Sequence, residues 1–238
     1  DYMPSYVLLT QARRHDRVGA RLLNLNPGSI VAMDRAYNDY QLFADWTARG
    51  IHFVTRLKAN ADYYVVEHRQ VPKNSSIRAD QVIRLLGVAA QKKCPQDLRR
   101  VVVWDKVNEC EIVLLTNHMD FGATTVADIY KDRWEIELFF KTLKQHLKVK
   151  TFVGTSENAL RIQLWTALIA LLLLKWLHYR SHLSWSFSNL AAMLRLNLFT
   201  HRDLLAWLKE PFGPPPELEA NAGQLHLQLP GFGQPRSV

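Results

Sequence analysis

The stretch YKDRWEIELFFKTLK, residues 130–144, carries cationic, acidic and aromatic side chains at helical spacing. At about 100° per residue, four polar side chains project within an arc of roughly 60°. These are Tyr130, Arg133, Glu137 and Lys144, and Lys141 and Lys148 border the same arc. Apolar side chains fill the neighbouring arc: Ile129, Ile136, Phe140, Leu143 and Leu147. We therefore predict one long amphipathic helix, which begins with a capping box at Thr125 and Asp128 and runs to about Lys148.

The polar arc of this helix has two physical readings. A carboxylate bracketed by cations, such as that of Glu137, is expected to be ionised and suits a divalent cation, while the cations can bind phosphate oxygens. In the alternative reading the arc is a solvated face, and Arg133 and Glu137 form a salt bridge worth roughly 0.3–0.5 kcal/mol. The helix by itself leaves both readings open.

The first part of the chain predicts a parallel α/β unit. The segments SYVLLT (5–10), SIVAMD (29–34) and IHFVTRL (51–57) have the composition of strands. We predict a helix from about residue 11 to Asn24, and another over NDYQLFADWTARG (38–50), with Asn38 or Asp39 as its cap and Gly50 as its stop. This alternation of strand and helix is typical of a parallel sheet.

From Lys58 the pattern changes to β-rich runs: YYVVEHRQV (63–71), RRVVVWD (99–105) and CEIVLLTN (110–117). Short polar segments separate them, which predicts hairpins and a β-rich insertion over about residues 58–120. Helices then return, and a second one opens near Ser156. Its apolar run LWTALIALLLLKWL (164–177) falls short of the roughly 18 residues that a membrane span needs, so we predict a buried core helix. The Pro- and Gly-rich tail over residues 209–238 is expected to be extended or disordered.

The spacing of Tyr, Arg, Glu and Lys within residues 130–144 resembles the Y-R-E-K signature of IS4-type DDE transposases at all four positions. IVAMDRAYNDY (30–40) resembles the strand end that bears the second catalytic Asp of that family, and residues 151–177 are similar to the helical segment after its glutamate. The likeness extends from Asp1 to about Trp207. It implies an α/β fold: an RNase H-like core in two parts, residues 1–57 and 121–208, interrupted by the predicted β-rich insertion.

The resemblance also implies roles for single residues. Asp34 and Glu137 match the second and third metal-binding carboxylates, which would hold two Mg²⁺ or Mn²⁺ ions roughly 3.5–4 Å apart for phosphoryl transfer on DNA. Tyr130, Arg133 and Lys144 match positions that grip the DNA backbone, and Lys141 and Lys148 would extend that contact. For Asp34 taken alone, a carboxylate that caps a turn or the next helix is the structural alternative.

One departure concerns the start of the core. The family's first catalytic Asp lies upstream of the segment that resembles YMPSYVLL (2–9), so the resemblance implies that this chain carries two of the three acids. In the family's strand order, 3-2-1-4-5, strands 1 and 2 would lie between SYVLLT and SIVAMD. The opening residues contain neither an initiator Met nor a signal peptide, so the chain looks cut at its front. We expect it to be poorly soluble and inactive when expressed alone.

Composition agrees with a nucleic-acid partner. Thirty Lys and Arg against twenty-two Asp and Glu give a net charge of +8, which favours a polyanion. Cys94 and Cys110 form no metal-binding pair and are expected to be reduced in the cytoplasm. The expected partner is double-stranded DNA, both the transposon ends and the target. We expect a homo-oligomer to bind it in the cytoplasm, near the bacterial nucleoid, and we expect no membrane partner.

Several alternatives stay open. Trp104 could receive a base flipped out of DNA, although an aromatic residue on a β-rich segment is more often part of a core. His178 and His182 have a spacing that can bind zinc, but a surface role at a helix end is the simpler reading. The first rival for the whole chain is a decayed transposase that binds DNA without catalysis, and the second is a basic protein of membrane surfaces.

Overall fold

The computed structural model describes residues 4, 6–9, 17–146, 154, 156–181, 185–197, 199–200 and 203–212. The chain divides into two compact units, Asp1–Leu168 and Ile169–Val238, and each is described by itself. Lys148, Leu147, His182 and the tail beyond Phe212 lie outside the described residues. Of the strand predicted over residues 5–10, the described residues 6–9 are not in a strand.

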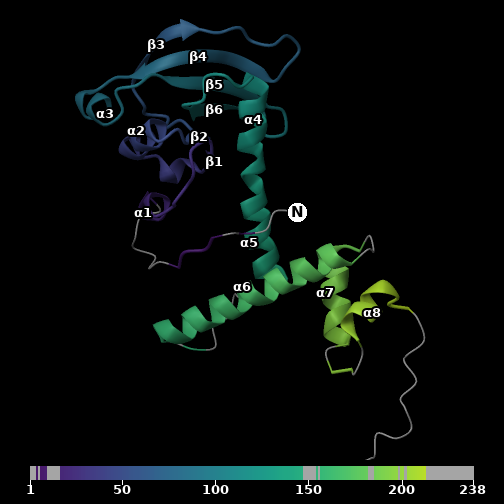
Figure 1. The fold of residues 1–238 in the computed structure, drawn as a ribbon. Coiled ribbons are helices and arrows are strands. Elements are labelled where there is room, and N and C mark those ends of the chain that lie inside the picture. The colour runs from purple at the N-terminus through teal and green to yellow at the C-terminus, as the bar shows by residue number, and fades with distance from the viewer. Residues whose placement is uncertain are drawn as a thin grey trace, which may run out of the picture. The chain divides into compact units, whose positions relative to one another are not determined.

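The first unit contains a six-stranded mixed sheet in the order β1-β2-β6-β5-β4-β3 (Figure 1). Its strands are β1 (Ile30–Ala32), β2 (His52–Arg56), β3 (Tyr63–His68), β4 (Ile77–Leu85), β5 (Leu98–Asp105) and β6 (Cys110–Thr116). β1 and β2 are parallel, as the strand–helix–strand pattern predicts, and every other pairing is antiparallel. The predicted hairpins therefore extend the same sheet that contains β1 and β2.

One face of the sheet is covered by α1 (Arg17–Arg21), α2 (Tyr40–Ala48) and the segment around α3 (Val88–Lys93) (Figure 1). Asp39 caps α2 by accepting from the N–H groups of Gln41 and Leu42, and Gly50 ends the segment at a φ of 69°. Phe43 of α2 stacks on Phe53 of β2 with ring centroids 4.0 Å apart, and both side chains are fully buried. This stacking joins the predicted helix to the predicted strand in one core.

The opposite face of the sheet is covered by α4 (Ala123–Asp132). Ala123, Val126 and Tyr130 recur at helical spacing on one side of α4 and pack on side chains of four strands. These strand residues are Val54, Ile77, Val101 and Leu114. Helices therefore cover both faces of the sheet in a three-layer α/β arrangement, and α4 packs against one of these faces.

The single long helix predicted from Thr125 to Lys148 is divided in the structure. α4 is followed by α5 (Trp134–His146), and Arg133 lies between them in α-helical conformation (Figure 1). Bonds from Arg133 N to Tyr130 O and from Ile136 N to Arg133 O have the tighter 3₁₀ spacing. The predicted capping box is wrong, because α4 begins after Gly122, which supplies no side-chain cap. Leu143 is buried, but Ile136 and Phe140 are about half exposed.

The second unit has its own small core around α7 (Phe187–Leu196) and α8 (Leu204–Lys209). Leu190, Trp207 and Leu208 are buried there, and Ser186 and Asp203 cap the two helices. The helix predicted from Ser156 is α6 (Glu157–Arg180), which begins in the first unit and ends in the second.

α6 is long and apolar enough to cross a membrane, a test that core helices of soluble proteins also pass. Only 22% of its most apolar window is buried, so the prediction of a buried core helix is wrong for the described chain. Ile162, Ile169, Leu173 and Tyr179 are among its exposed side chains.

Candidate functional site

Asp34 lies just after β1, at the start of a short 3₁₀ turn, Arg35–Tyr37. Its Oδ1 accepts from the N–H of Ala36 at 3.0 Å, so the turn-capping role considered from the sequence is present. Its Oδ2 instead lies 3.7 Å from Nη1 of Arg133. One oxygen of the half-exposed carboxylate therefore fixes the local backbone, and the other is directed to the end of α4.

The loop that carries Asp34 is tied to β2 by a buried amide. Asn38 donates through Nδ2 to the carbonyl of Arg56 at 2.8 Å, and its Oδ1 accepts from the Thr55 hydroxyl at 2.8 Å. Asn38 and Thr55 are both buried, so these bonds are shielded from water. The ends of the parallel strands β1 and β2 are thereby held in a fixed relation beside Asp34.

Arg133 connects the two carboxylates that the sequence predicts. Its Nη1 donates to Oε1 of Glu137 at 2.8 Å and lies 3.7 Å from Oδ2 of Asp34. Because both oxygens approach one nitrogen atom, their separation cannot exceed the sum of those two distances. That limit is far below the roughly 12 Å beyond which two shared hard cations cannot bridge two carboxylates.

The side chain of Arg133 is only 11% exposed, and its guanidinium lies over two aromatic rings, 5.3 Å from the centre of Tyr130 and 5.5 Å from that of Trp134. Burial disfavours its charged form, but the hydrogen bond to Glu137 and the neighbouring charges raise the pKa of Arg133 above its ordinary value. Arg133 therefore stays cationic between the carboxylates. The i,i+4 salt bridge considered from the sequence is present, and it is part of a larger cluster.

Tyr130 lies beneath this cluster, and 5% of the residue is exposed. Burial raises the pKa of its hydroxyl, while the charges of Arg133 and Arg56 oppose that rise. Neither the Tyr130 hydroxyl nor Nε of Arg133 has a partner with hydrogen-bond geometry among the described residues, although the two side chains are adjacent. Buried polar atoms without partners are costly, so their presence here marks hydrogen-bonding capacity that a ligand could use.

The other residues predicted to contact DNA are Lys141, Lys144, Lys148 and Trp104. Lys141 and Lys144 are exposed on α5, and Lys148 is outside the described residues. Trp104 is partly buried on β5, where the guanidinium of Arg78 lies 5.7 Å from the centre of its ring. His178 points to the carbonyl of Trp185, 2.7 Å from its Nε2.

Two residues of the site escaped sequence reasoning. Asn38 was predicted only as a possible helix cap, a role that Asp39 takes, and Arg56 was not singled out. The signal for Arg56 was its position at the end of the strand IHFVTRL, next to the strand that precedes Asp34. Ligand-binding side chains collect where parallel strands end at their carboxyl side.

The donor set is compatible with a hard divalent cation but is not complete. Asp34 and Glu137 offer carboxylate oxygens, the ligands that Mg²⁺ and Mn²⁺ prefer. No group of three or more His, Cys, Asp or Glu side chains with metal-binding geometry occurs in the described part of the chain. The two acids fit as part of a metal site, with Arg133 as the cation that neutralises them here.

The fold and site define a class of mixed α/β proteins that carry an acidic and basic cluster at the ends of parallel strands. The chain belongs to the transposase DDE domain family, whose model matches residues 3–173. The resemblance to IS4-type DDE transposases is thereby confirmed.

Three relatives carry transposase names. One from Sinorhizobium fredii is 31% identical over 87% of this chain and 59% of its own length. One named for insertion sequence element IS5377 of Geobacillus stearothermophilus is 35% identical over 74% of this chain and 46% of its own. One named for element IS4SA of Synechocystis is 31% identical over 73% of this chain and 49% of its own length. The chain spans about half the length of the curated relatives that it matches.

Proposed function

We propose that this chain forms part of the catalytic domain of an insertion-sequence transposase that cleaves transposon ends and transfers strands by metal-dependent phosphoryl transfer. The observation that carries the proposal is the double contact of Arg133 Nη1 with Asp34 and Glu137. This double contact joins, beside the edge strand β1, the two acids and the cation to which the family resemblance assigns catalysis and DNA binding.

In this proposal Asp34 and Glu137 hold Mg²⁺ or Mn²⁺. Ions held there would supply the activation of a water or a 3′-hydroxyl and the stabilisation of the leaving oxygen. Asp34 is well suited to a fixed ligand, because its Oδ1 is anchored to Ala36 and its loop is anchored through Asn38. A third carboxylate is required, and among the described residues none joins Asp34 and Glu137 in a group of three.

The cationic residues bind the DNA backbone in the same proposal. The Tyr130 hydroxyl and Arg133 Nε supply donors that have no partner in hydrogen-bond geometry among the described residues, and Lys144 and Lys141 add charge along α5. Arg133 contacts both carboxylates, and a phosphate would compete for the same guanidinium. Trp104 is kept as a candidate for stacking on a DNA base, because the residue is only partly buried on β5.

We also propose that β1 and β2 belong to an RNase H-like core and that β3–β6 form its insertion. The position of β1 at the edge of the sheet supports this, since further strands of such a core could pair there. The core would then comprise residues 1–57 and 121–208. DNA-bound oligomers near the nucleoid would be the working form.

A chimera tests the proposal. This chain replaces the matching segment of the Geobacillus relative, and transposition of a marked element is counted in cells. We expect activity that is lost at least a hundredfold in both Asp34→Asn and Glu137→Gln, while Glu135→Gln on the same helix retains it. An active chimera in which Glu137→Gln has no effect would contradict the assignment.

A DNA-binding protein without catalysis is the second candidate. The observation that favours it is that the described residues provide two clustered acids and no group of three. A chimera that binds element ends through Arg133 but never cleaves them would support this candidate.

A further inference from the structure

A buried ion pair joins β4 to β5 on the sheet face that α4 covers. Arg99 donates through Nε to Oδ1 of Asp80 at 2.8 Å and through Nη2 to Oδ2 at 2.6 Å. Both side chains are almost fully enclosed, with 2% and 3% of their surface exposed. The pair is therefore bidentate and shielded from solvent.

Stability alone is a weak explanation for such a pair. Removing two charges from water is costly, and apolar residues of similar volume often replace a buried ion pair without loss of stability. Val101, the register partner of Asp80 on β5, already belongs to the apolar cluster that packs on α4. What an apolar replacement could not supply is the set of further hydrogen bonds that Arg99 makes.

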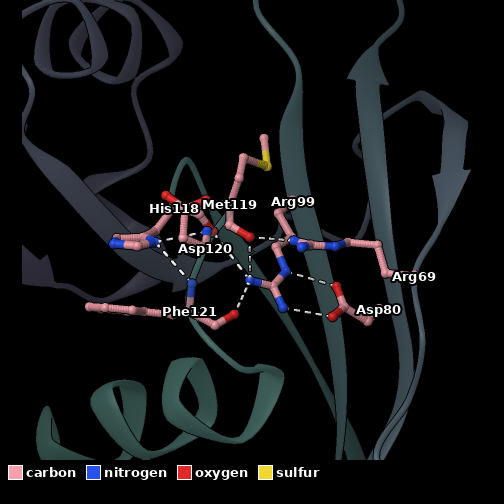
Figure 2. A network of polar contacts seen from close by, with 7 residues as sticks. All are labelled: Arg69, Asp80, Arg99, His118, Met119, Asp120 and Phe121. Atoms are coloured by element: carbon pink, nitrogen blue, oxygen red, sulfur yellow. Dashed lines mark hydrogen bonds and ion pairs between the residues drawn. The ribbon is translucent and has the colours of Figure 1, made fainter.

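The third nitrogen of Arg99 holds the loop that leads from β6 into α4. Its Nη1 donates to the carbonyls of His118 at 3.4 Å, Met119 at 3.3 Å and Phe121 at 2.5 Å (Figure 2). Arg69 donates to the same Met119 carbonyl at 2.5 Å. Figure 2 shows these carbonyls converging on the guanidinium, with Asp80 on its other side. Asp80 thus fixes the orientation in which Arg99 faces the loop.

The loop also decides where α4 begins. Gly122 precedes the first turn and provides no side-chain cap, so the helix has no capping side chain of its own at that end. Within the loop, Nδ1 of His118 accepts from the N–H groups of Asp120 and Phe121, and its ring stacks on Phe121 at 3.6 Å. Arg99 therefore fixes a compact loop from the sheet side.

Tyr130 and Arg133 follow at the other end of α4, roughly 10 Å and 15 Å along the helix axis from its first residue. A packed helix transmits a shift of its first turn to its last, because its backbone hydrogen bonds keep it rigid. A loosened loop would therefore displace the Tyr130 hydroxyl and the guanidinium that meets Asp34.

We infer that Arg99, oriented by Asp80, is a positioning residue, which sets the start of α4 and thereby places Tyr130 and Arg133 against Asp34. What the positioned residues bind rests on the proposed function. The placement itself does not depend on it.

The test compares three variants of the full chain, each fused to a soluble carrier. Asp80→Leu with Arg99→Met removes the charges together and keeps the volume, but takes the Arg99 donor away from the carbonyls of His118 and Phe121 and leaves Met119 with Arg69 alone. Arg99→Lys keeps one positive charge without the forked geometry. The matched control is Arg84→Met with Asp97→Leu, which removes a bidentate ion pair between β4 and the residue before β5. Within the described residues this pair is not hydrogen-bonded to the loop. Thermal unfolding, amide hydrogen exchange and binding of a fluorescent DNA duplex are measured.

We expect the Asp80/Arg99 double variant to unfold cooperatively, with at least tenfold faster exchange at residues 118–126 and at least fivefold weaker DNA binding. Arg99→Lys should give smaller changes in the same direction, and the Arg84/Asp97 control should match the wild type. Unchanged loop exchange in the folded double variant would overturn the inference. Should the double variant not fold, Arg99→Lys decides by the same two readouts.

A separate arm tests the proposed function. If Arg133→Gln binds DNA as tightly as the wild type, the proposed role of the site in DNA binding fails. The exchange of residues 118–126 then decides the positioning role without reference to DNA.

Discussion

Arg133 and Asp34 form an ion pair between the end of α4 and the loop after β1, with Nη1 3.7 Å from Oδ2. Asp34 reaches this place because β1 pairs with β2 in parallel. Arg133 reaches it because α4 packs on side chains of β2, β4, β5 and β6. Neither position follows from a local preference. The site is therefore a product of the fold.

The Tyr130 hydroxyl should matter for binding and not for folding. It is buried beside the Arg133 guanidinium without a partner in hydrogen-bond geometry among the described residues, so Tyr130→Phe is expected to leave the free energy of unfolding unchanged or raised by up to about 1 kcal/mol. Loss of a hydrogen bond to a charged phosphate should weaken DNA binding about tenfold. Urea unfolding and fluorescence anisotropy measure the two quantities. Tyr64→Phe on β3 is the control, and unchanged affinity in Tyr130→Phe would remove the hydroxyl from the site.

Arg133 should compete with a divalent cation for the same oxygens. Because its Nη1 contacts Glu137 and approaches Asp34, Arg133→Gln leaves two neighbouring carboxylates without their cation. We expect Mn²⁺ to bind the variant severalfold more tightly than the wild type, as measured by paramagnetic resonance of free Mn²⁺. Arg161→Gln, which removes another i,i+4 ion pair, is the control. Weaker Mn²⁺ binding in Arg133→Gln would show that Arg133 supports the metal site.

The loop before α4 should respond to pH through His118. Its pKa is lowered by burial and then by the charge of His52, with a smaller effect of Arg99, while Asp120 opposes the shift. The unfolded chain therefore takes up a proton near pH 6.5 before the folded chain does, and stability falls as the pH decreases from 7 towards 5. Protonation also removes the Nδ1 acceptor used by Asp120 and Phe121.

His118→Asn isolates this effect. Its Oδ1 can accept the same backbone N–H groups but does not titrate. The free energy of unfolding, measured by urea between pH 7 and pH 5, should decline less steeply in this variant than in the wild type. Equal slopes would mean that other groups carry the pH dependence.

The sequence predicts the elements with local signals well. The Asp39 cap, the stop at Gly50 and the strand IHFVTRL follow from side-chain preferences and are present. β4 was missed because Asp80, Gln81 and Arg84 interrupt its apolar alternation. These polar residues belong there, since Asp80 pairs with Arg99 and Arg84 with Asp97, and neither partner can be identified from the sequence near β4.

The break at Arg133 was unpredictable for a similar reason. Helical spacing continues through Arg133, and no Pro or Gly marks an interruption. The spacing did place Arg133 and Glu137 on one face, which the structure shows as a hydrogen bond at 2.8 Å. The partner on the other side, Asp34, could be anticipated only through the family resemblance, because no periodicity links positions so far apart.

Cleavage of the protein backbone by bound Fe²⁺ tests the shared metal site most directly. Fe²⁺ prefers similar oxygen ligands and, with ascorbate and peroxide, cuts the chain next to where it binds. The account predicts two cuts, one near Asp34 and one near Glu137, both suppressed by Mg²⁺ and both lost in either Asp34→Asn or Glu137→Gln. A cut at one of the two positions that survives substitution of the other residue would contradict a site held in common.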